Sequence, residues 1–262
     1  MSGNFLHNPG SSTEVRNGST DLGKNPTVAV VVPTYNEADN LPLLAERIFQ
    51  LKIPNTKLIV VDDGSPDGTG ELANKLNRQF KQDIAVIQRG QKLGLGTAYV
   101  AGFSLALSEG ADYVVQMDAD LSHSPEYIPD LLRRLNEADI VIGSRYISGG
   151  GVDKTWNVMR KLLSFVGNLG IRLVTGLNVK DATSGFKAFH GRVLRSLNLN
   201  QFRCEGFGFQ AEVTHACQTN GFQIVEHPIV FGGRLKGNSK LSLAIILEAF
   251  WHLSHLRLNR IR

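Results

Sequence analysis

Cysteine is scarce in this chain, and long uninterrupted hydrophobic stretches are missing. Only Cys204 and Cys217 occur among the 262 residues, which fits neither a zinc ribbon nor a disulfide framework, so we expect two reduced, buried thiols. No stretch reaches the roughly 18–20 apolar residues that a membrane-spanning helix needs. The N-terminus also lacks the charged start, apolar run and cleavage site of a secretory signal. The sequence therefore predicts a chain that is not exported and does not span a bilayer.

A strong charge of one sign is also lacking. The chain has 28 Lys and Arg against 24 Asp and Glu, a net charge of +4, which is too small to indicate nucleic-acid binding. With 42% hydrophobic and 20% charged residues, the composition is that of a folded soluble protein. The positive charge is concentrated at one end, because residues 232–262 hold six basic residues and one acid. This end is a candidate for contact with an anionic membrane surface.

Strands and helices alternate along the first half of the chain. A continuous β-branched run at 28–32 predicts a strand covered on both faces and ended by Pro33. The expected strands continue at 57–61, 84–88, 113–118 and 139–143, and the expected helices lie at 40–50, 70–80, 94–108 and 125–136. Asn40 is expected to cap the first of these helices. This order predicts an α/β, Rossmann-like fold, with a mostly parallel sheet and helices on both of its faces. Ligands of such sheets bind beyond the carboxyl ends of the strands.

The remaining segments divide the chain into three parts. Residues 1–26 are rich in Gly, Ser, Asn and Thr and predict a flexible arm, and residues 27–240 form one folded domain. Within that domain, helices are expected at 156–173 and 208–219 and a strand at 222–226. Residues 241–262 predict an amphipathic helix, whose apolar stripe suits either membrane contact or ordinary core packing. Another face of that helix carries three potential zinc ligands, which a polar helix face explains equally well: Glu248, His252 and His255.

The most informative short motif is Asp118-Ala119-Asp120, at the end of an apolar strand. Two carboxylates two residues apart on extended backbone project to the same side, close enough to share one cation. A hard divalent ion held by one or two carboxylates, and otherwise by water and phosphate oxygens, is typical of magnesium or manganese bound to a nucleotide diphosphate. By itself, the pattern is explained equally well by an acidic strand end that faces water.

Three other segments resemble known motifs without matching them. Residues 62–68 are rich in Asp and Gly but lack the ligand spacing of an EF-hand, which leaves either a simple turn or recognition of a base or ribose. Residues 94–99 lack the third glycine of a dinucleotide-binding loop, and no P-loop sequence occurs. Residues 234–240 interleave three cations with small residues, which suits phosphate binding but also suits a solvated basic loop.

Taken together, the segments resemble family 2 glycosyltransferases of the GT-A fold, and most closely the dolichol- or polyprenol-phosphate mannose synthases. The resemblance runs from about residue 28 to residue 241 and is carried by the order and spacing of six motifs. These are Pro33-Thr34-Tyr35-Asn36-Glu37, Asp62-Asp63-Gly64-Ser65-Pro66-Asp67-Gly68-Thr69, Met117-Asp118-Ala119-Asp120-Leu121-Ser122-His123, Gly143-Ser144-Arg145-Tyr146, Thr183-Ser184-Gly185-Phe186 and the segment 234–240. One departure is Gly233, where the family usually has an acidic residue before the arginine.

The resemblance implies a function and a set of site residues. The family transfers mannose from GDP-mannose to a lipid phosphate with inversion, so the implied cofactor is Mg²⁺ or Mn²⁺ and the implied location is the cytoplasmic face of a membrane. A membrane-anchoring subunit is left open, as is a sister activity with another nucleotide sugar such as UDP-glucose, or a nucleotide-binding module without catalysis. The implied nucleoside contacts are Pro33, Tyr35, Glu37, Val61 and Asp63. The implied diphosphate, metal and phosphate contacts are Asp118, Ala119, Asp120, Arg145, Arg234 and Lys240.

The chemistry of such an acceptor determines which side chains the reaction needs. A phosphate monoester is already anionic at neutral pH, so it has to be positioned rather than deprotonated. Cations are therefore expected to offset the repulsion between the acceptor and the donor diphosphate. Asp181 and Glu205 are candidate general bases only if the acceptor is a hydroxyl.

Overall fold

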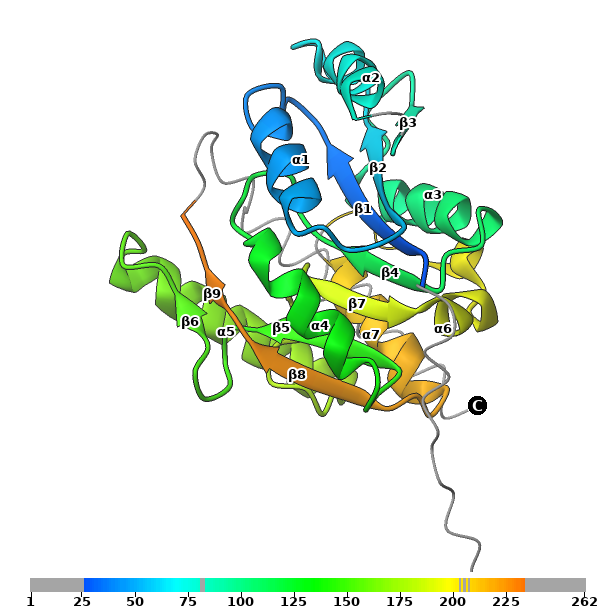
Figure 1. Ribbon diagram of the computed structural model, residues 1–262. Helices are drawn as coiled ribbons and strands as arrows, with labels where there is room; N and C mark the ends of the chain where they lie inside the picture. The colour runs from blue at the N-terminus through cyan, green and yellow to red at the C-terminus, as the bar shows by residue number, and fades with distance from the viewer. Residues whose placement is uncertain (1–25, 81–82, 203, 205, 207, 234–262) are drawn as a thin grey trace, which may run out of the picture.

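A seven-stranded sheet forms the centre of the computed structural model, which describes residues 26–80, 83–202, 204, 206 and 208–233 (Figure 1). Its strand order is β3-β2-β1-β4-β7-β5-β8. The strands of this sheet are β1 (Val28–Thr34), β2 (Thr56–Asp62), β3 (Ile84–Gln88), β4 (Tyr113–Gln116), β5 (Ile140–Ser144), β7 (Lys187–His190) and β8 (Ile224–Pro228). A separate two-stranded sheet pairs β6 (Gly151–Val152) with β9 (Val230–Phe231).

Helices cover both faces of the sheet, as predicted. The helices are α1 (Leu41–Gln50), α2 (Thr69–Gln79), α3 (Leu95–Ser108), α4 (Ile128–Arg134), α5 (Val158–Thr175), α6 (Gly191–Ser196) and α7 (Gly208–Thr219), with short 3₁₀ turns η1 (Pro125–Tyr127) and η2 (Leu199–Gln201). The apolar run of β1 supplies two cores, because its alternate side chains point to opposite faces. Val31 packs in one core with residues of α3 and α7, and Val30 and Val32 pack in the other with residues of α1 and α4.

The mostly parallel sheet is confirmed, with one antiparallel strand that the sequence did not predict. Strand β7 lies between β4 and β5 and runs antiparallel to both, and Lys187 is in register with Gln116 and with Ile142. Because β4 and β5 are both antiparallel to β7, they are parallel to each other, and their carboxyl ends lie at the same edge of the sheet. The inserted strand therefore joins the two halves of the chain into one sheet.

Two predicted strand ends were wrong. Strand β1 continues through Pro33 to Thr34. The Pro33 nitrogen faces β4, but β4 ends at Gln116, opposite Val31, so no hydrogen bond is lost where proline lacks an N–H group. Strand β4 ends two residues before the predicted Asp118, so the acidic motif lies in a turn.

Two helix predictions also need correction. The helix predicted over 125–136 is divided into η1 and α4, and each part has a proline in its first turn. Asn40 precedes α1 as expected, but its side chain makes no capping bond and instead donates from Nδ2 to Glu37 Oε2 at 2.8 Å.

Several other expectations can be compared with the described residues. Cys204 and Cys217 are free and buried, as predicted. Within the part of the chain that the structure describes, no helix has the length and hydrophobicity that crossing a membrane requires. Residues 1–25 and 234–262 are not described, so nearly all of the predicted N-terminal arm, Arg234, Lys240 and the predicted terminal helix lie outside the structure.

Candidate active site

The polar residues singled out in the sequence lie at one edge of the sheet. Tyr35 follows β1, Asp63 follows β2, Asp118 follows β4 and Arg145 follows β5. These four strands are parallel to one another, so their carboxyl ends open onto the same edge. This is the edge at which open α/β sheets bind their ligands.

The Asp118–Asp120 motif is held in a tight turn rather than on the extended backbone that we predicted. Leu121 adopts a left-handed backbone with φ 62°, and the Ser122 amide donates to Asp120 Oδ1 at 3.0 Å. The Asp118 amide donates to His123 Nδ1 at 3.1 Å, which closes the turn. The hydroxyl of Tyr99, a fully buried residue of α3, donates to Asp118 Oδ1 at 3.2 Å. Burial raises the pKa of Tyr99, and the carboxylates of Asp118 and Asp120 raise it further, which keeps this hydroxyl protonated as a donor.

His123 lies beside the Asp118 carboxylate, with its Nδ1 3.7 Å from Asp118 Oδ2. Its ring is buried against Phe186 and Phe231, with ring centroids 5.2 Å and 5.0 Å away. Burial lowers the pKa of His123, although the charges of Asp118 and Asp120 oppose this effect. Because Nδ1 accepts a hydrogen bond from a backbone amide, the neutral ring carries its proton on Nε2.

The oxygen atoms around this turn fit a hard divalent cation. Asp120 is almost fully buried, whereas the Asp118 side chain is 26% exposed. The Ser122 hydroxyl is buried and has no hydrogen-bond partner among the residues that the structure describes. Carboxylate and hydroxyl oxygens are the ligands that Mg²⁺ and Mn²⁺ prefer, and a cation held by two carboxylates usually keeps sites for water and phosphate. Asp118 and Asp120 are therefore suited to hold one, with Ser122 beside them.

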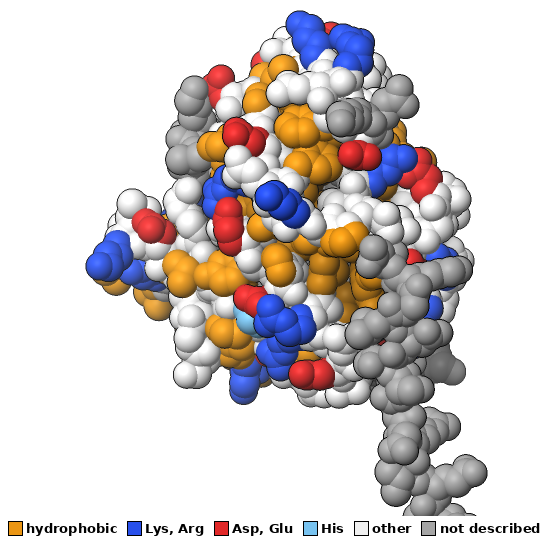
Figure 2. Space-filling view, in the orientation of Figure 1, with side chains coloured by type: hydrophobic (Ala, Val, Ile, Leu, Met, Phe, Trp, Pro, Cys, Tyr) orange, Lys and Arg blue, Asp and Glu red, His pale blue; other side chains and the backbone are white. Residues whose placement is uncertain are grey.

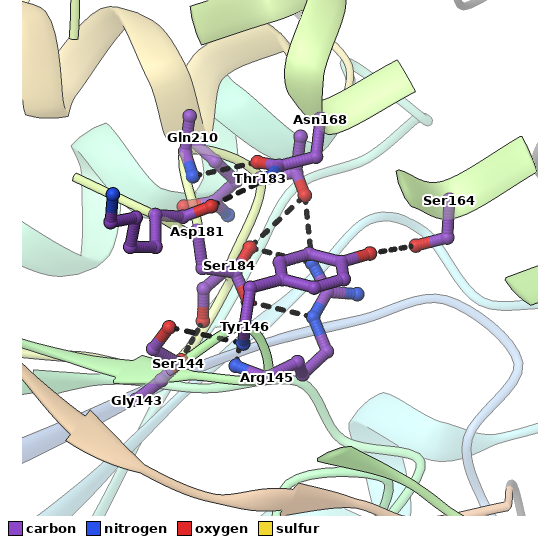
Figure 3. A network of polar contacts seen from close by, with 12 residues as sticks. Gly143, Ser144, Arg145, Tyr146, Ser164, Asn168, Asp181, Thr183, Ser184 and Gln210 are labelled. Carbon is purple, nitrogen blue, oxygen red and sulfur yellow. Dashed lines mark hydrogen bonds and ion pairs between the residues drawn. The ribbon is translucent and has the colours of Figure 1, made fainter. Parts of the chain in front are cut away.

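Arg145 forms a buried two-pronged ion pair with Asp181 (Figure 3). Its Nε donates to Asp181 Oδ2 at 2.8 Å, and its Nη2 donates to Asp181 Oδ1 and to Thr183 Oγ1 at 2.7 Å each. Burial alone would raise the pKa of Asp181, but the guanidinium lowers it below its ordinary value. Asp181 is therefore ionised, fully buried and already paired, which excludes the role of general base that the sequence left open for it. Glu205 lies outside the described residues.

Helix α5 and the loop before β7 hold this ion pair in place. Tyr146 shares a 2.7 Å hydrogen bond between its hydroxyl and Ser164 Oγ on α5, and its ring lies 5.2 Å from the Arg145 guanidinium. Asn168 of α5 donates to the Lys180 carbonyl at 2.6 Å and accepts from the Ala182 amide at 2.9 Å. The residues on both sides of Asp181 are thus held by hydrogen bonds to Asn168 of α5.

The residues expected to hold a nucleoside lie together, but two of them have structural contacts of their own. The Asp63 carboxylate pairs with Arg89 and accepts the amides of Leu93 and Gly94 at 3.3 Å and 3.1 Å, so it organises the loop between β3 and α3. The Val61 side chain is fully buried in the core. The Tyr35 ring lies at the surface of the site, with Lys92 Nζ 4.3 Å from its centroid.

The acids of the 62–68 segment hold a turn, which was one of the two alternatives left open. Asp62 accepts the Ser65 amide at 3.1 Å, and Asp67 accepts the amides of Thr69 and Ala38 at 3.0 Å and 3.1 Å. The bond to Ala38 ties this turn to the loop after β1. These two carboxylates therefore position the loops that surround Tyr35.

A buried lysine lies behind the two charged clusters. Lys187 of β7 is fully buried, and its Nζ donates to the Ser184 carbonyl at 2.7 Å, to the Gln210 carbonyl at 3.2 Å and to Gln210 Oε1 at 2.7 Å. Burial lowers the pKa of Lys187 from 10.5 to about 7, although the carboxylates of Asp181 and Asp118 oppose this effect. Lys187 thus ties the loop that carries Thr183 and Gly185 to α7.

We expect Lys187→Met to remove a pH dependence of stability. In the native protein Lys187 loses its proton near pH 7, whereas the unfolded chain keeps that proton until about pH 10.5. The unfolded state therefore binds more protons between these values, and the free energy of unfolding of the wild type should rise with pH there, by at most about 1.4 kcal/mol per pH unit. Urea unfolding of both proteins at several pH values between 7 and 10 measures the difference. Parallel pH profiles of the two proteins would contradict the assignment.

Some residues that shape the site were given no role from the sequence. Tyr99 and Arg89 were not predicted, because their partners Asp118 and Asp63 lie far away along the chain. His123, Thr183 and Gly185 stood in quoted motifs without a role. Gly185 leaves room for the site, because a Cβ there would lie 3.2 Å from His123 Cε1 and 3.4 Å from Asp118 Oδ1. A polar residue inside an apolar helix, such as the tyrosine of α3, is the one hint that the sequence offered.

Comparison with known proteins gives related sequences over most of the chain. Residues 29–197 match the model of the family described as Glycosyl transferase family 2. An undecaprenyl-phosphate mannosyltransferase from Micrococcus luteus is 42% identical over 222 residues, which cover 85% of this chain and 90% of that protein. A polyprenol monophosphomannose synthase from Mycolicibacterium smegmatis is 41% identical over 238 residues, which cover 89% of each chain.

Solved structures share the fold. A crystal structure of glucosyl-3-phosphoglycerate synthase from Mycobacterium tuberculosis, in complex with Mn²⁺, UDP and glucosyl-3-phosphoglycerate, matches with a TM-score of 0.60 and 22% identity. The match covers 98% of this chain and 86% of that one. At this identity the likeness concerns the fold, and it confirms the predicted GT-A architecture.

Proposed function

Because this chain belongs to glycosyl transferase family 2 and is therefore a glycosyltransferase, we propose that it transfers mannose from GDP-mannose to the phosphate of a dolichyl or polyprenyl lipid. The proposed reaction proceeds with inversion at the sugar carbon and depends on Mg²⁺ or Mn²⁺. The names of the two relatives, which share more than 40% of their aligned residues with this chain, support the sugar and the lipid.

The observation that carries the proposal is the convergence of opposite charges around His123. Asp118 Oδ2 lies 3.7 Å from His123 Nδ1. On another side of the buried His123 ring, the Phe231 ring centroid is 5.0 Å away and lies 5.4 Å from the central carbon of the Arg145 guanidinium. A donor diphosphate needs a cation between itself and the carboxylates, and an acceptor phosphate needs a positive partner beside the donor. The carboxylates and the guanidinium of this cluster support the assignment of both roles to it.

The carboxylates of Asp118 and Asp120 would hold the divalent cation. When bound, this cation neutralises the negative charge that grows on the nucleoside diphosphate as the sugar bond breaks. The hydrogen bonds from Tyr99 and from the Ser122 amide fix the two carboxylates, so little reorganisation is needed when the charge changes. The Ala119 backbone lies between them and is a further proposed contact of the diphosphate.

Arg145 would position the acceptor phosphate for attack on the sugar carbon. Its bond to Asp181 fixes the guanidinium plane, and the rings of Tyr146 and Phe231 lie 5.2 Å and 5.4 Å from its central carbon. An acceptor that is already anionic requires no proton transfer, which agrees with a site whose buried acid is paired with an arginine. The positive charge also offsets the repulsion between the two phosphates.

The nucleoside would occupy the space beside the loops after β1 and β2. Tyr35 offers a ring face there, and the Asp63–Arg89 pair shapes the opposite loop. We further propose contacts with Pro33, with Glu37 and with the backbone of Val61. The Gly232 amide donates to the Ser122 carbonyl at 2.8 Å, which anchors the chain beside the acidic turn two residues before Arg234. We therefore propose Arg234 and Lys240 as the remaining phosphate contacts.

A lipid acceptor implies work at a membrane surface. We propose that the protein is peripheral and acts at the cytoplasmic face of a membrane, where nucleotide sugars are available. A separate membrane-anchoring subunit is compatible with this proposal but is not required by it.

Sugar transfer into an organic-extractable lipid tests the proposal. Purified protein is incubated with Mg²⁺ or Mn²⁺, polyprenyl phosphate and a panel of donors labelled in the sugar, including GDP-mannose, UDP-glucose and GDP-glucose. We expect label in the lipid phase with GDP-mannose and no comparable transfer from the other donors. Efficient transfer from UDP-glucose alone would assign the sister activity, and binding of GDP without any transfer would overturn the proposed reaction.

Tyr99→Phe should weaken metal use while the fold is retained. The change removes the hydroxyl that donates to Asp118 Oδ1 but leaves the ring stacked on Phe209. Loss of a partner that orients a metal ligand typically costs about 10–100-fold in metal affinity or activity. We expect the Mn²⁺ concentration for half-maximal transfer to rise by about tenfold. Tyr113→Phe, in which the changed ring contacts His190, is the matched control, and equal metal titrations of both variants would contradict this role.

A further inference from the structure

Helix α5 presents an unusually apolar surface to solvent. Of the eleven large hydrophobic side chains that are exposed among the described residues, eight belong to this one helix. They form what we term the outer face of α5: Val158, Met159, Leu162, Leu163, Phe165, Val166, Leu169 and Leu173. At about 100° per residue they occupy an arc of about 160°, so they form one continuous face. Contiguous exposed apolar surface of this extent marks a binding surface.

The opposite side of the same helix belongs to the protein core. Asn168, Ile171 and Thr175 are buried there, and Ser164 bonds to Tyr146. Helix α5 is therefore amphipathic in an unusual sense, since one face packs on the protein and the opposite, apolar face meets solvent. Figure 1 shows α5 at the left of the molecule, behind β6 and β9.

Basic residues border the outer face on both sides. On the helical wheel, Lys161 and Arg172 fall at one edge and Arg160 falls at the other, and Lys154 precedes the helix. The helix contains no acidic residue. Figure 2 shows Lys and Arg side chains beside hydrophobic ones at the left edge of the molecule, where Figure 1 places the beginning of α5. An apolar face with basic edges is the pattern of helices that lie in the surface of an anionic bilayer.

We propose that the outer face of α5 docks on an anionic lipid bilayer. The helix would lie parallel to the surface, with its apolar side chains among the acyl chains and its basic edges among the head groups. Charge favours this partner over two others. A second copy of the chain would bring two sets of basic edges together, and the segment 241–262, which carries three arginines and one acid, would also meet like charge.

The position of α5 links this docking surface to the proposed acceptor site. Through Ser164 and Phe165, the helix contacts Tyr146, whose ring lies beside Arg145. The element that would lie on the lipid surface is therefore the one that supports the proposed phosphate-binding arginine. This step rests on the proposed lipid-phosphate acceptor, whereas the binding of α5 to lipid can be measured without it.

Vesicle sedimentation tests the docking surface with the full-length protein. Vesicles of phosphatidylcholine, with and without phosphatidylglycerol, are used in the absence of donor and acceptor. We expect the wild type to bind the anionic vesicles preferentially and Leu162→Glu to weaken this binding by about tenfold, because it removes apolar surface and adds a charge that the lipid repels. Leu43→Glu on α1 is the matched control and should bind as the wild type does, since Leu43 is similarly exposed, at 41% against 53% for Leu162.

Two further variants test the basic residues that border the outer face of α5. Lys154→Gln and Lys161→Gln should each weaken binding to the anionic vesicles by about fivefold and leave binding to pure phosphatidylcholine unchanged. Equal loss on both kinds of vesicle would show that the charges do not act on the lipid and would overturn the electrostatic part of the proposal.

A labelled variant tests the same face without weakening it. Val166→Cys, 55% exposed in the wild type, can carry an NBD fluorophore, because Cys204 and Cys217 are buried. We expect its emission to shift to the blue with anionic vesicles, and the emission of labelled Leu43→Cys to stay unchanged. No shift at position 166 would overturn the proposal.

The alternatives to a bilayer predict different results. If the segment 241–262 or a second copy covers the outer face, Leu162→Glu leaves vesicle binding unchanged and instead lowers the melting temperature or the oligomeric mass. Either result overturns the proposal. Because neither substrate is present in these assays, a failure of mannose transfer leaves their outcome untouched, and a failure of docking leaves the transfer assay to decide the reaction.

Discussion

Asp120→Asn should lower kcat for mannosyl transfer by at least about 10²–10³-fold at saturating donor and acceptor. The amide keeps the size of the side chain and can still accept the Ser122 amide, so the turn is retained. What is lost is the negative charge that would hold the cation beside the leaving diphosphate. Steady-state kinetics with GDP-mannose over a range of Mn²⁺ concentrations measure the effect.

A matched exposed acid separates this effect from a general loss of charge. Asp83→Asn changes an exposed aspartate in the loop before β3 and should leave kcat unchanged. The wild type in excess EDTA should lose transfer as Asp120→Asn does, and added Mn²⁺ should restore only the wild type. Full activity of the wild type in chelator would contradict the metal requirement.

Asp181→Asn should reduce the free energy of unfolding by about 3–5 kcal/mol, because it leaves the buried Arg145 guanidinium without its counter-charge. The Asp181 carboxyl is fully buried and the Arg145 side chain is 10% exposed, so water screens the pair little. The same change should raise KM for the lipid phosphate, since the guanidinium loses the carboxylate that orients it. Urea denaturation and acceptor kinetics measure the two effects.

The pH dependence of this difference provides an internal check. The pKa of Asp181 is lowered in the native protein, so its contribution to stability is present above the ordinary value of 3.8 and is lost as the pH falls through the native pKa. The wild type should therefore lose its advantage over Asp181→Asn only in acid. Asp130→Asn, which breaks the exposed pair with Arg133, is the matched control and should cost less than about 1 kcal/mol. Equal stability of the wild type and Asp181→Asn near neutral pH would contradict the account.

The fold could be predicted from the sequence wherever a local pattern determines it. The β-branched run of β1 and the alternation that follows it predicted the strands β1 to β5 along the chain, and α7 was predicted with its observed bounds. Strand β7 could not be predicted, because it has four residues, includes a buried lysine and owes its place to two neighbouring strands. The two-stranded sheet of β6 and β9 escaped prediction for the same reason, since each strand has only two residues.

The motifs of the site could be predicted from the sequence, but the pairs of side chains that bond to each other there could not. The acidic turn and Arg145 stand at strand ends, where the sequence alone places ligand-binding groups. The partner of Arg145 lies 36 residues away, and the tyrosine that bonds Asp118 lies 19 residues away on another element. Such pairs are set by tertiary packing, which neither periodicity nor spacing records. The apolar outer face of α5 was also missed, because its spacing predicts a helix without showing which side is covered.

A crystal structure of the protein with Mn²⁺ and GDP tests the central claim most directly. The anomalous signal of manganese locates the ion independently of the surrounding density. The account predicts one peak within coordination distance of carboxylate oxygens of Asp118 and Asp120, with the GDP phosphates on its other side and the base near Tyr35. A nucleotide bound elsewhere, or a manganese peak remote from both carboxylates, would contradict it.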